Sequence, residues 1–228
     1  MLFPNLSITN FFDDPDEIVK LANTLDYFPS PTGNYPGVRS RSLHVIDPNL
    51  FHKFTNAVLA NFYNKGTEIK FEAWVNFQKI PALHKDKNNV KNKGWIHFDD
   101  AVLAGLVYLN KKADLDSGTS LYLPKGKLKH DWSKATDLKV NLYLNGVYDK
   151  KEYEKEMKYT DNKFKKFMEF NNVYNTLICY DGQNYHKINN MNIGTDKDRL
   201  TLVFFINNIT VDGTPITRVK EILNEKSI

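Results

Sequence analysis

The sequence predicts an α+β protein in which helices come first and a jelly-roll-like set of about eight strands follows. Apolar residues recur at helical spacing in the first part of the chain and at alternating positions from about Glu68 onward. Of the 228 residues, 41% are hydrophobic and 13% aromatic, which is enough for a sizeable buried core. We therefore expect one domain over residues 1–228, with supporting helices and a loop at 1–67, a core at 68–207 and a tail at 208–228.

Composition and charge exclude several classes of function. The formal net charge is only +4, and the basic residues are mostly dispersed lysines, unlike the focused basic stripe of a nucleic-acid reader. The only arginines are Arg39, Arg41, Arg199 and Arg218. Cys179 is the single cysteine, so an intrachain disulfide is impossible and a reducing compartment is expected. Without a signal-like N-terminus or a membrane-length apolar run, we expect a soluble cytoplasmic protein, and nothing in the sequence indicates its oligomeric state.

Two helices are predicted near the N-terminus, each opened by an Asp-Pro pair. Asp14 and Pro15 provide a cap and a first-turn proline, and Asp47 and Pro48 repeat this arrangement. The apolar stripe of the first helix consists of Ile18, Leu21, Ala22 and Leu25. A Pro/Gly-rich segment that leads into a short strand, residues 28–46, is expected between the helices.

The first strand of the core is predicted at residues 70–80, where the two faces differ. One face carries Trp74, Asn76 and Gln78, together with Glu72. The other face is apolar and consists of Phe71, Ala73, Val75 and Phe77. A strand with one apolar and one polar, aromatic face suits a wall that lines a pocket. The Lys/Asn-rich residues 81–94 are expected to form a loop near the pocket mouth.

The rest of the chain predicts more strands and one helical insertion. Strand-like segments occur at residues 94–110, 119–124, 138–146, 173–182, 185–188 and 199–207. Charged helical material is expected at 149–173, within an insertion that spans about residues 125–172. A hairpin at Asp212-Gly213 and a helical tail at 216–226 are expected to close the chain.

The segment GWIHFDD, which begins at Gly94, contains the clearest candidate for a metal site. In a strand, His97 and Asp99 point to the same face and Asp100 to the opposite one, so Asp99 is the preferred carboxylate. His186 lies on a later strand and provides a third candidate ligand. Two histidines and one carboxylate with open positions suit Fe(II). Alone, His97 would instead be a core histidine whose hydrogen bonds are satisfied.

Arg199 begins an otherwise apolar strand, which indicates an inward-facing guanidinium. A buried cation is costly unless an anion pairs with it. The carboxylate of a dicarboxylate cosubstrate would match the planar guanidinium. The alternative is a surface ion pair with Asp196 or Asp198.

Five segments in this order resemble the iron(II)/2-oxoglutarate-dependent dioxygenases. They are HFD at 97–99, VYLN at 107–110, SGTSLY at 117–122, YH at 185–186 and RLTLVFF at 199–205. The resemblance covers about residues 68–207. It is strongest to the prolyl 4-hydroxylase-like branch and, within it, to a poorly characterised subgroup. The fold that it implies is a double-stranded β-helix, or cupin-like jelly roll, with N-terminal supporting helices.

The resemblance also implies a set of site residues. His97, Asp99 and His186 would bind Fe(II), and Arg199 would hold the distal carboxylate of 2-oxoglutarate, assisted by Tyr108. The further candidates for cosubstrate binding are Thr201, Asn76 and Gln78. The candidates for substrate binding are Trp95, Trp74, Arg39 and Arg41.

The activity implied is that of a hydroxylase acting on a peptidyl or small-molecule substrate. Such an enzyme uses O₂ and converts 2-oxoglutarate to succinate while it oxidises a C–H bond. The alternative is a non-catalytic jelly-roll binding or structural protein with a vestigial metal site. A nucleic-acid demethylase ranks lower, because that branch has a second arginine where Phe205 stands here and an N-x-Y motif where this chain has Asn76, Phe77 and Gln78.

Overall fold

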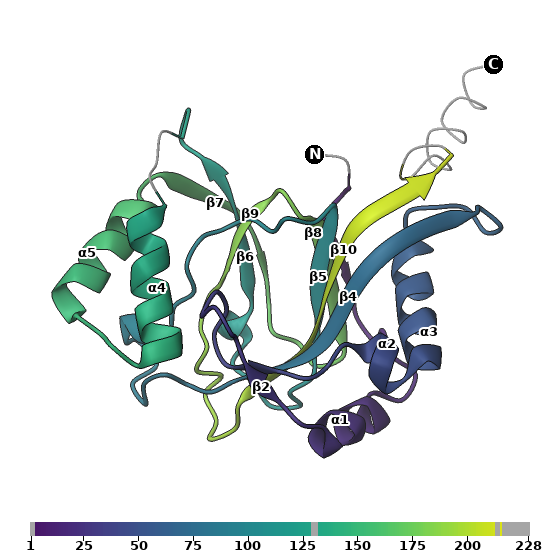
Figure 1. The fold of residues 1–228 in the computed structure, drawn as a ribbon, viewed down its shortest axis with the longest axis horizontal. Helices are drawn as coiled ribbons and strands as arrows, with labels where there is room; N and C mark the ends of the chain where they lie inside the picture. The colour runs from purple at the N-terminus through teal and green to yellow at the C-terminus, as the bar shows by residue number, and fades with distance from the viewer. Residues whose placement is uncertain (1–2, 129–131, 213–214, 216–228) are drawn as a thin grey trace.

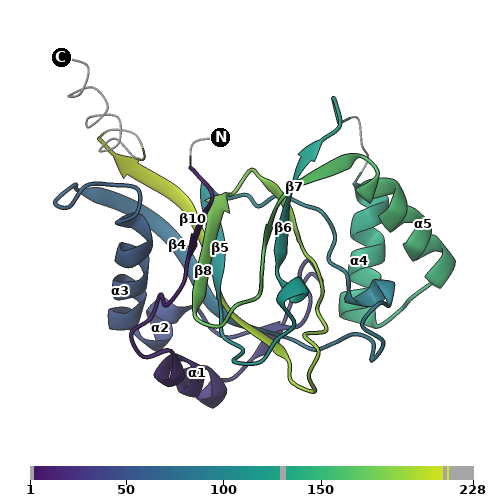
Figure 2. The same ribbon diagram turned by 180° about the vertical axis from the view of Figure 1, so that it is seen from behind.

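Two antiparallel sheets form the centre of the protein, and helices lie on either side of them (Figure 1, Figure 2). The structure, a computed structural model, describes residues 3–128, 132–212 and 215. The large sheet has seven strands in the order β1-β8-β5-β10-β4-β3-β2, and the small sheet has three in the order β7-β6-β9. The pairs for which a register is given are all antiparallel. This arrangement confirms the predicted α+β class with a jelly-roll core.

The strands of the two sheets are of very different lengths. The large sheet contains β1 (Leu6–Ile8), β2 (Phe28–Pro29), β3 (Val38–Arg39), β4 (Ile69–Ile80), β5 (Leu103–Tyr108), β8 (Thr176–Asp181) and β10 (Arg199–Val211). The small sheet contains β6 (Thr119–Pro124), β7 (Phe164–Phe170) and β9 (Tyr185–Ile188). The long strands β4 and β10 pair along almost their whole length, with a bulge between Ile206 and Asn208. One face of this strand pair packs against the N-terminal helices, and the other face lines the space between the sheets.

The helices begin where the sequence places caps. The described helices are α1 (Pro15–Thr24), α2 (Leu43–Ile46), α3 (Pro48–Leu59), α4 (Ser133–Asn145) and α5 (Lys150–Asp161), with short 3-10 turns at Val90–Asn92 and Leu115–Ser117. Asp14 accepts a hydrogen bond from the amide of Glu17, and Asp47 accepts one from the amide of Leu50. These are the predicted Asp caps, and each one satisfies an amide that the first turn leaves without a partner.

The larger core lies between the N-terminal helices and one face of the large sheet. Phe54 and Val58 of α3 pack in one cluster with Val75, Phe77 and other apolar residues of the sheet. The opposite face of the large sheet meets the small sheet in a second cluster, to which the two sheets contribute Leu106, Tyr108, Ile178, Tyr180, Val203, Leu121 and Phe170. The faces of β4 are therefore as predicted: its apolar face covers the core, and its polar face turns to the space between the sheets.

Two predicted elements are wrong. Residues 138–146, predicted as a strand, lie mostly in helix α4, because Ala135, Leu138 and Leu142 are spaced by three and four residues and are buried together. The second half of the predicted helical insertion is strand β7, in which Phe164 and Phe170 are buried at an even spacing and pair across to β6.

Two smaller differences concern the extent of predicted strands. Part of the short strand expected before residue 46 is helix α2 (Leu43–Ile46). The strand expected over residues 94–110 is regular only in β5. Gly213 of the predicted hairpin and the predicted tail helix at 216–226 lie outside the described residues. In the part of the chain that is described, no helix has the length and apolar character needed to cross a membrane.

Candidate active site

A cavity of about 510 Å³ lies at the polar face of the large sheet, within the usual size range of small-molecule sites. Its walls include β3, β4, β5, β8 and β10 of the large sheet, β6 and β9 of the small sheet, helix α4, and residues 34–36 and 94–100. The candidate residues that line it are His97, Asp99, His186, Arg199, Asn76, Gln78, Trp95, Trp74 and Arg39. The fold thus brings together most of the residues that the sequence singled out.

His97 and His186 are held side by side by the backbone. The amide of His97 donates to the carbonyl of His186 over 3.0 Å, and the amide of His186 donates back over 2.7 Å. This isolated antiparallel bridge places the two imidazole centroids 4.3 Å apart. Asp99 is held near them because its amide donates to the carbonyl of Gly182.

The hydrogen bonds of the two imidazoles select the tautomer that a metal needs. Nδ1 of His97 lies 2.8 Å from the carbonyl oxygen of Trp95, and Nδ1 of His186 lies 2.9 Å from that of Asn184. A carbonyl only accepts, so each Nδ1 carries the proton and each Nε2 keeps its lone pair free. Such a backbone contact is how ligating histidines are commonly oriented.

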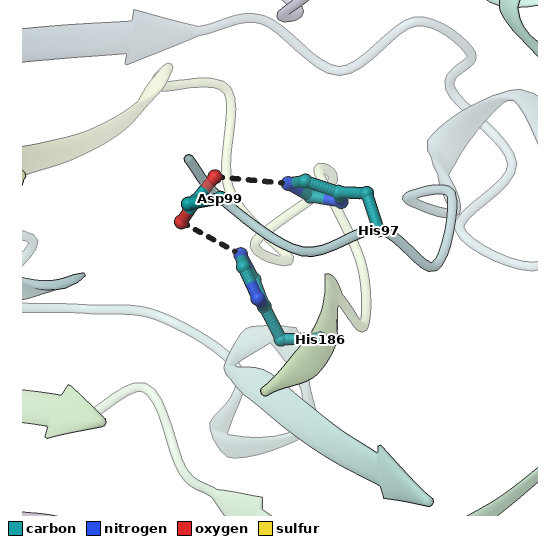
Figure 3. A group of neighbouring side chains, drawn as sticks. All are labelled: His97, Asp99 and His186. Atoms are coloured by element: carbon teal, nitrogen blue, oxygen red, sulfur yellow. Dashed lines mark ion pairs between the residues drawn. The ribbon is translucent and has the colours of Figure 1, made fainter. Parts of the chain in front are cut away.

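Both Nε2 atoms face the carboxylate of Asp99 (Figure 3). The Nε2 of His97 is 3.8 Å from Oδ1, and the Nε2 of His186 is 3.3 Å from Oδ2. One ligand atom from each residue lies within 4.8 Å of the others, a spacing that can hold a metal ion. Two neutral imidazoles and one carboxylate, all on one side, fit a divalent transition metal with open positions.

The electrostatics of the pocket favour neutral imidazole at His97. Its side chain is 46% exposed because it faces the open cavity. Partial desolvation by the cavity walls, reinforced by the adjacent His186, lowers the pKa of His97 below its ordinary value. His97 is therefore ready to bind a metal at neutral pH.

Asp100 also lines the cavity but lies outside the His97, Asp99 and His186 cluster. Of the two carboxylates, Asp99 is the one that the fold places beside both imidazoles. His97 forms only an isolated bridge, and Asp99 is not in a regular strand. The amides of His97 and Asp99 donate to the carbonyls of His186 and Gly182, and these backbone bonds hold Asp99 beside the histidines.

Arg199 is a buried cation that has no counter-ion among the described residues. It is 1% exposed, it forms no ion pair with a described residue, and its Nη2 has no hydrogen-bond partner there. Its Nε donates to the carbonyl of Ser117 over 3.4 Å. Burial lowers its pKa, and Tyr108 opposes this effect. The alternative of a surface pair with Asp196 or Asp198 does not describe this side chain, whereas a carboxylate in the cavity would complete its hydrogen bonds.

Tyr108 and Thr201 are fully buried beside Arg199 and do not line the cavity directly. The guanidinium carbon of Arg199 lies 5.4 Å from the ring centroid of Tyr108. The hydroxyl of Tyr108 donates to Thr119 over 3.0 Å, and Thr119 itself faces the cavity. The hydroxyl of Thr201 has no partner among the described residues. Buried polar groups of this kind are satisfied when a polar ligand or water is bound.

The remaining candidates differ in their surroundings. Asn76 and Gln78 donate their amide nitrogens to the carbonyls of Ser40 and Pro36, so they anchor the segment that precedes β4 in the sheet. Three other candidates are Trp95, Trp74 and Arg41. Trp95 is buried and donates to the hydroxyl of Tyr153, whereas Trp74 is 57% exposed at the cavity. Arg41 is exposed and does not line the cavity.

Lys139 and Tyr180 face the cavity and were missed in the sequence. Lys139 lies on α4, in the segment that was predicted to be a strand, so its position could not be inferred. Tyr180 alternates with Cys179 on β8 and therefore faces inward, which strand alternation would have indicated. Burial, followed by the charge of Asp99, raises the pKa of Tyr180 well above its usual value.

A family model described as a family of unknown function, DUF6445, matches residues 4–206. The chain belongs to the DUF6445 family. No curated protein matches its sequence significantly.

The fold of this DUF6445 chain is similar to that of several solved structures. HygX from Streptomyces hygroscopicus, solved with nickel and 2-oxoglutarate bound, has 12% identity and a TM-score of 0.51 over 88% of this chain and 81% of HygX. The epimerase SnoN, solved with Fe³⁺, alpha ketoglutarate and nogalamycin RO, has 12% identity and a TM-score of 0.50 over 93% and 83%. A prolyl hydroxylase from Trichoplax adhaerens, in complex with a hypoxia inducible factor peptide fragment, has 11% identity and a TM-score of 0.48 over 89% and 82%.

At such identities the likeness to HygX and SnoN establishes the fold. This DUF6445 chain shares its fold with two proteins that were each solved with a metal and 2-oxoglutarate (alpha ketoglutarate) bound. The resemblance inferred from HFD, YH and the strand that begins at Arg199 is therefore confirmed at the level of the superfamily fold. A fold supports many functions, so the activity has to be argued from the site.

Proposed function

We propose that this protein is an Fe(II)- and 2-oxoglutarate-dependent dioxygenase that hydroxylates a peptidyl or small-molecule substrate. The observation that carries the proposal is one cavity with two halves. One half is the cluster of His97, Asp99 and His186, and the other is the unpaired guanidinium of Arg199. A metal site and a carboxylate site in the same cavity are what a metal-chelating dicarboxylate requires.

Each residue has a defined task in this proposal. His97, Asp99 and His186 would hold the Fe(II), which with O₂ and 2-oxoglutarate supplies the oxidising chemistry and yields succinate. Arg199 would bind the distal carboxylate of 2-oxoglutarate, and the hydroxyls of Tyr108 and Thr201 would support that end. The carbonyls of Trp95 and Asn184 keep both imidazoles in the metal-binding tautomer.

The proposal is tested by anaerobic titration of the purified protein with Fe(II) and 2-oxoglutarate, followed by an assay of succinate in air. We expect a weak visible charge-transfer band and slow succinate formation even without a substrate. His97→Ala and Asp99→Ala should abolish both signals, because each removes a metal ligand.

His52→Ala is the matched control, because His52 is exposed on α3 and lies outside the cavity. It should retain both the band and the turnover. A wild-type protein that gives neither signal would contradict the proposal and favour a non-catalytic jelly-roll binding or structural protein. Unchanged turnover in Asp99→Ala would contradict the assignment of the metal ligands.

A further inference from the structure

The cavity contains a second guanidinium that the proposed chemistry leaves unused. Arg39 on β3 lines the same cavity as the His97, Asp99 and His186 cluster. Its guanidinium carbon stacks 3.8 Å from the ring centroid of Tyr35 and 5.3 Å from that of Phe205. Stacking of this kind fixes the plane of a guanidinium and leaves its edge free to bind.

No carboxylate of the described residues lies within ion-pair distance of Arg39. No hydrogen bond of its side chain is found there either, and its buried Nε has no partner among them. Burial lowers the pKa of Arg39, and the nearby Tyr35 and Asp99 raise it. A desolvated cation with so little compensation is costly, and a bound anion would provide that compensation.

The segment that carries Arg39 is anchored against β4. Gln78 donates to the carbonyl of Pro36, and Asn76 donates to the carbonyl of Ser40. Between them, Gly37 has φ of 71°, and a Cβ there would come within 2.1 Å of the carbonyl oxygen of Lys79, so only glycine permits this approach. Arg39 is therefore held in place before any ligand binds, which reduces the entropy lost on binding.

Arg39 and Arg199 occupy different parts of the cavity. Arg39 pairs with Gln78 across β3 and β4, whereas Arg199 pairs with Ile80 across β10 and β4. Two strand spacings and a shift of two residues separate their Cα atoms by about 12 Å. One guanidinium can therefore hold the cosubstrate while the other remains available to a second molecule.

The charge and the walls of the cavity indicate what that second molecule is. Three cations line the cavity, Arg39, Lys139 and Arg199, against the two carboxylates of Asp99 and Asp100. Trp74, which pairs with Phe205 on the neighbouring strand, presents an exposed aromatic face there. An anion attached to an apolar or aromatic body fits both features.

We propose that Arg39 is a substrate-binding residue and that the substrate is a small organic acid whose carboxylate Arg39 binds. The inference rests on the proposed oxygenase function, and it names the class of substrate for that site. The planar fork of the guanidinium matches a carboxylate through two parallel hydrogen bonds. The aromatic wall at Trp74 and Phe205 holds the rest of the molecule beside the metal cluster.

The test is calorimetric titration of the anaerobic protein loaded with Fe(II) and saturating 2-oxoglutarate. The probes are benzoate, phenylacetate and hexanoate, each compared with its own amide, which has a similar shape and no charge. We expect at least one acid to bind more tightly than its amide. Arg39→Gln should remove that preference with a loss of about 10-fold to 100-fold in acid affinity. The affinity for 2-oxoglutarate should remain near that of the wild type.

Arg41→Gln is the matched control, because it removes an exposed arginine two residues away and outside the cavity. It should keep the preference for acids. The inference is overturned if the wild type binds none of the acids more tightly than its amide. It is also overturned if the preference for an acid persists in Arg39→Gln. Loss of 2-oxoglutarate binding in Arg39→Gln would assign Arg39 to the cosubstrate instead. The charge-transfer band of the loaded wild type distinguishes failure of the proposed oxygenase function from failure of the proposed substrate class. If the band is absent, the oxygenase function is contradicted. If it is present, the acid titrations test only the substrate class.

Discussion

Arg199 shows how a single residue can cost stability in return for a binding site. Its guanidinium is buried without an ion pair to a described residue and is held by one long hydrogen bond to Ser117. A buried charge in this state costs several kcal/mol of desolvation that nothing in the ligand-free protein fully repays. An apolar residue of similar volume would avoid this cost and would also remove the proposed anion site.

We therefore predict that Arg199→Met separates stability from function. The ligand-free variant should melt at the same temperature as the wild type or higher, with a gain of up to ~4 kcal/mol in the free energy of unfolding. Fe(II) should still bind through His97, Asp99 and His186, but 2-oxoglutarate should no longer change the absorption spectrum or the melting temperature. Differential scanning calorimetry with and without 2-oxoglutarate measures both effects.

Arg41→Met is the control for this prediction, because substitution at that exposed position should change stability by no more than ~0.5 kcal/mol. A marked loss of stability in Arg199→Met with retained 2-oxoglutarate binding would show that the guanidinium is a structural group.

The sequence indicated the candidate metal ligands better than it indicated the secondary structure and the other cavity residues around them. His97 and His186 stood out because of their order and their neighbours, and the fold places them together. Asp99 was preferred because a strand would put it beside His97, and it does lie there, in a segment outside the regular strands that backbone bonds hold against residues 182–186. The missed Lys139 reaches the cavity only through the packing of α4, which depends on contacts between segments far apart in the chain.

At the scale of single elements, the N-terminal cap of α1 allows a direct test of whether a capping side chain predicted from the sequence stabilises its helix. Asp14 accepts a hydrogen bond from the amide of Glu17 over 3.1 Å, while the neighbouring Asp13 has no capping role. We predict that Asp14→Ala lowers the free energy of unfolding by about 1 kcal/mol, because it leaves a first-turn amide without its partner. Urea denaturation measures the change.

Asp13→Ala removes the same charge one residue earlier and serves as the matched control. It should leave the urea midpoint close to that of the wild type. Equal effects of the two variants would mean that net charge near the helix start, and not the cap, provides the stabilisation.

Elements with a strong local signal were predictable, and those decided by packing were not. Asp-Pro pairs located α1 and α3, and alternation located β4, β8 and β10. The apolar residues of LKVNLYLNG alternate in part and favour a strand, but Leu138 and Leu142 are buried on one helical face against Tyr153 and Met157 of α5. FKKFMEF follows a charged helix without a clear break, and only its pairing with β6 makes it a strand.

At the scale of the whole molecule, the single cysteine reports on global unfolding. Cys179 lies on β8 in the large sheet, fully buried in the core that packs against the N-terminal helices. Burial raises the pKa of its thiol to about 12 from an ordinary value of 9.0. The folded protein therefore keeps the thiol both neutral and inaccessible, and the reactive thiolate forms only when the sheet opens.

We predict that iodoacetamide modifies Cys179 at pH 8 only through global unfolding. In the proposed function Fe(II) and 2-oxoglutarate bind the folded state, so a concentration of 100 times the apparent Kd should slow modification by about 100-fold. Mass spectrometry of timed samples measures the rate, and a chelator should restore it. An unaltered rate in the presence of both ligands would mean that they do not bind the native fold or that β8 opens locally.

The same thiol gives stability a defined dependence on pH. The unfolded chain loses the proton of Cys179 near pH 9, whereas the folded chain keeps it until about pH 12. The contribution of this group to stability is therefore complete below about pH 9 and declines as the pH rises from there towards 12. Cys179→Ala should remove that part of the alkaline decline in the urea midpoint between pH 8 and pH 10.

The reciprocal backbone bridge between His97 and His186 makes the metal cluster sensitive to strand register. A slip of one residue on β9 would place Tyr185 or Lys187 opposite His97 and turn the imidazole of His186 to the other face. A phenol or an ammonium in that place cannot replace the neutral nitrogen donor. Binding of a metal ion would thus stabilise only those folded chains in which His97 and His186 pair in register. Chains with the wrong register would lack that added stability.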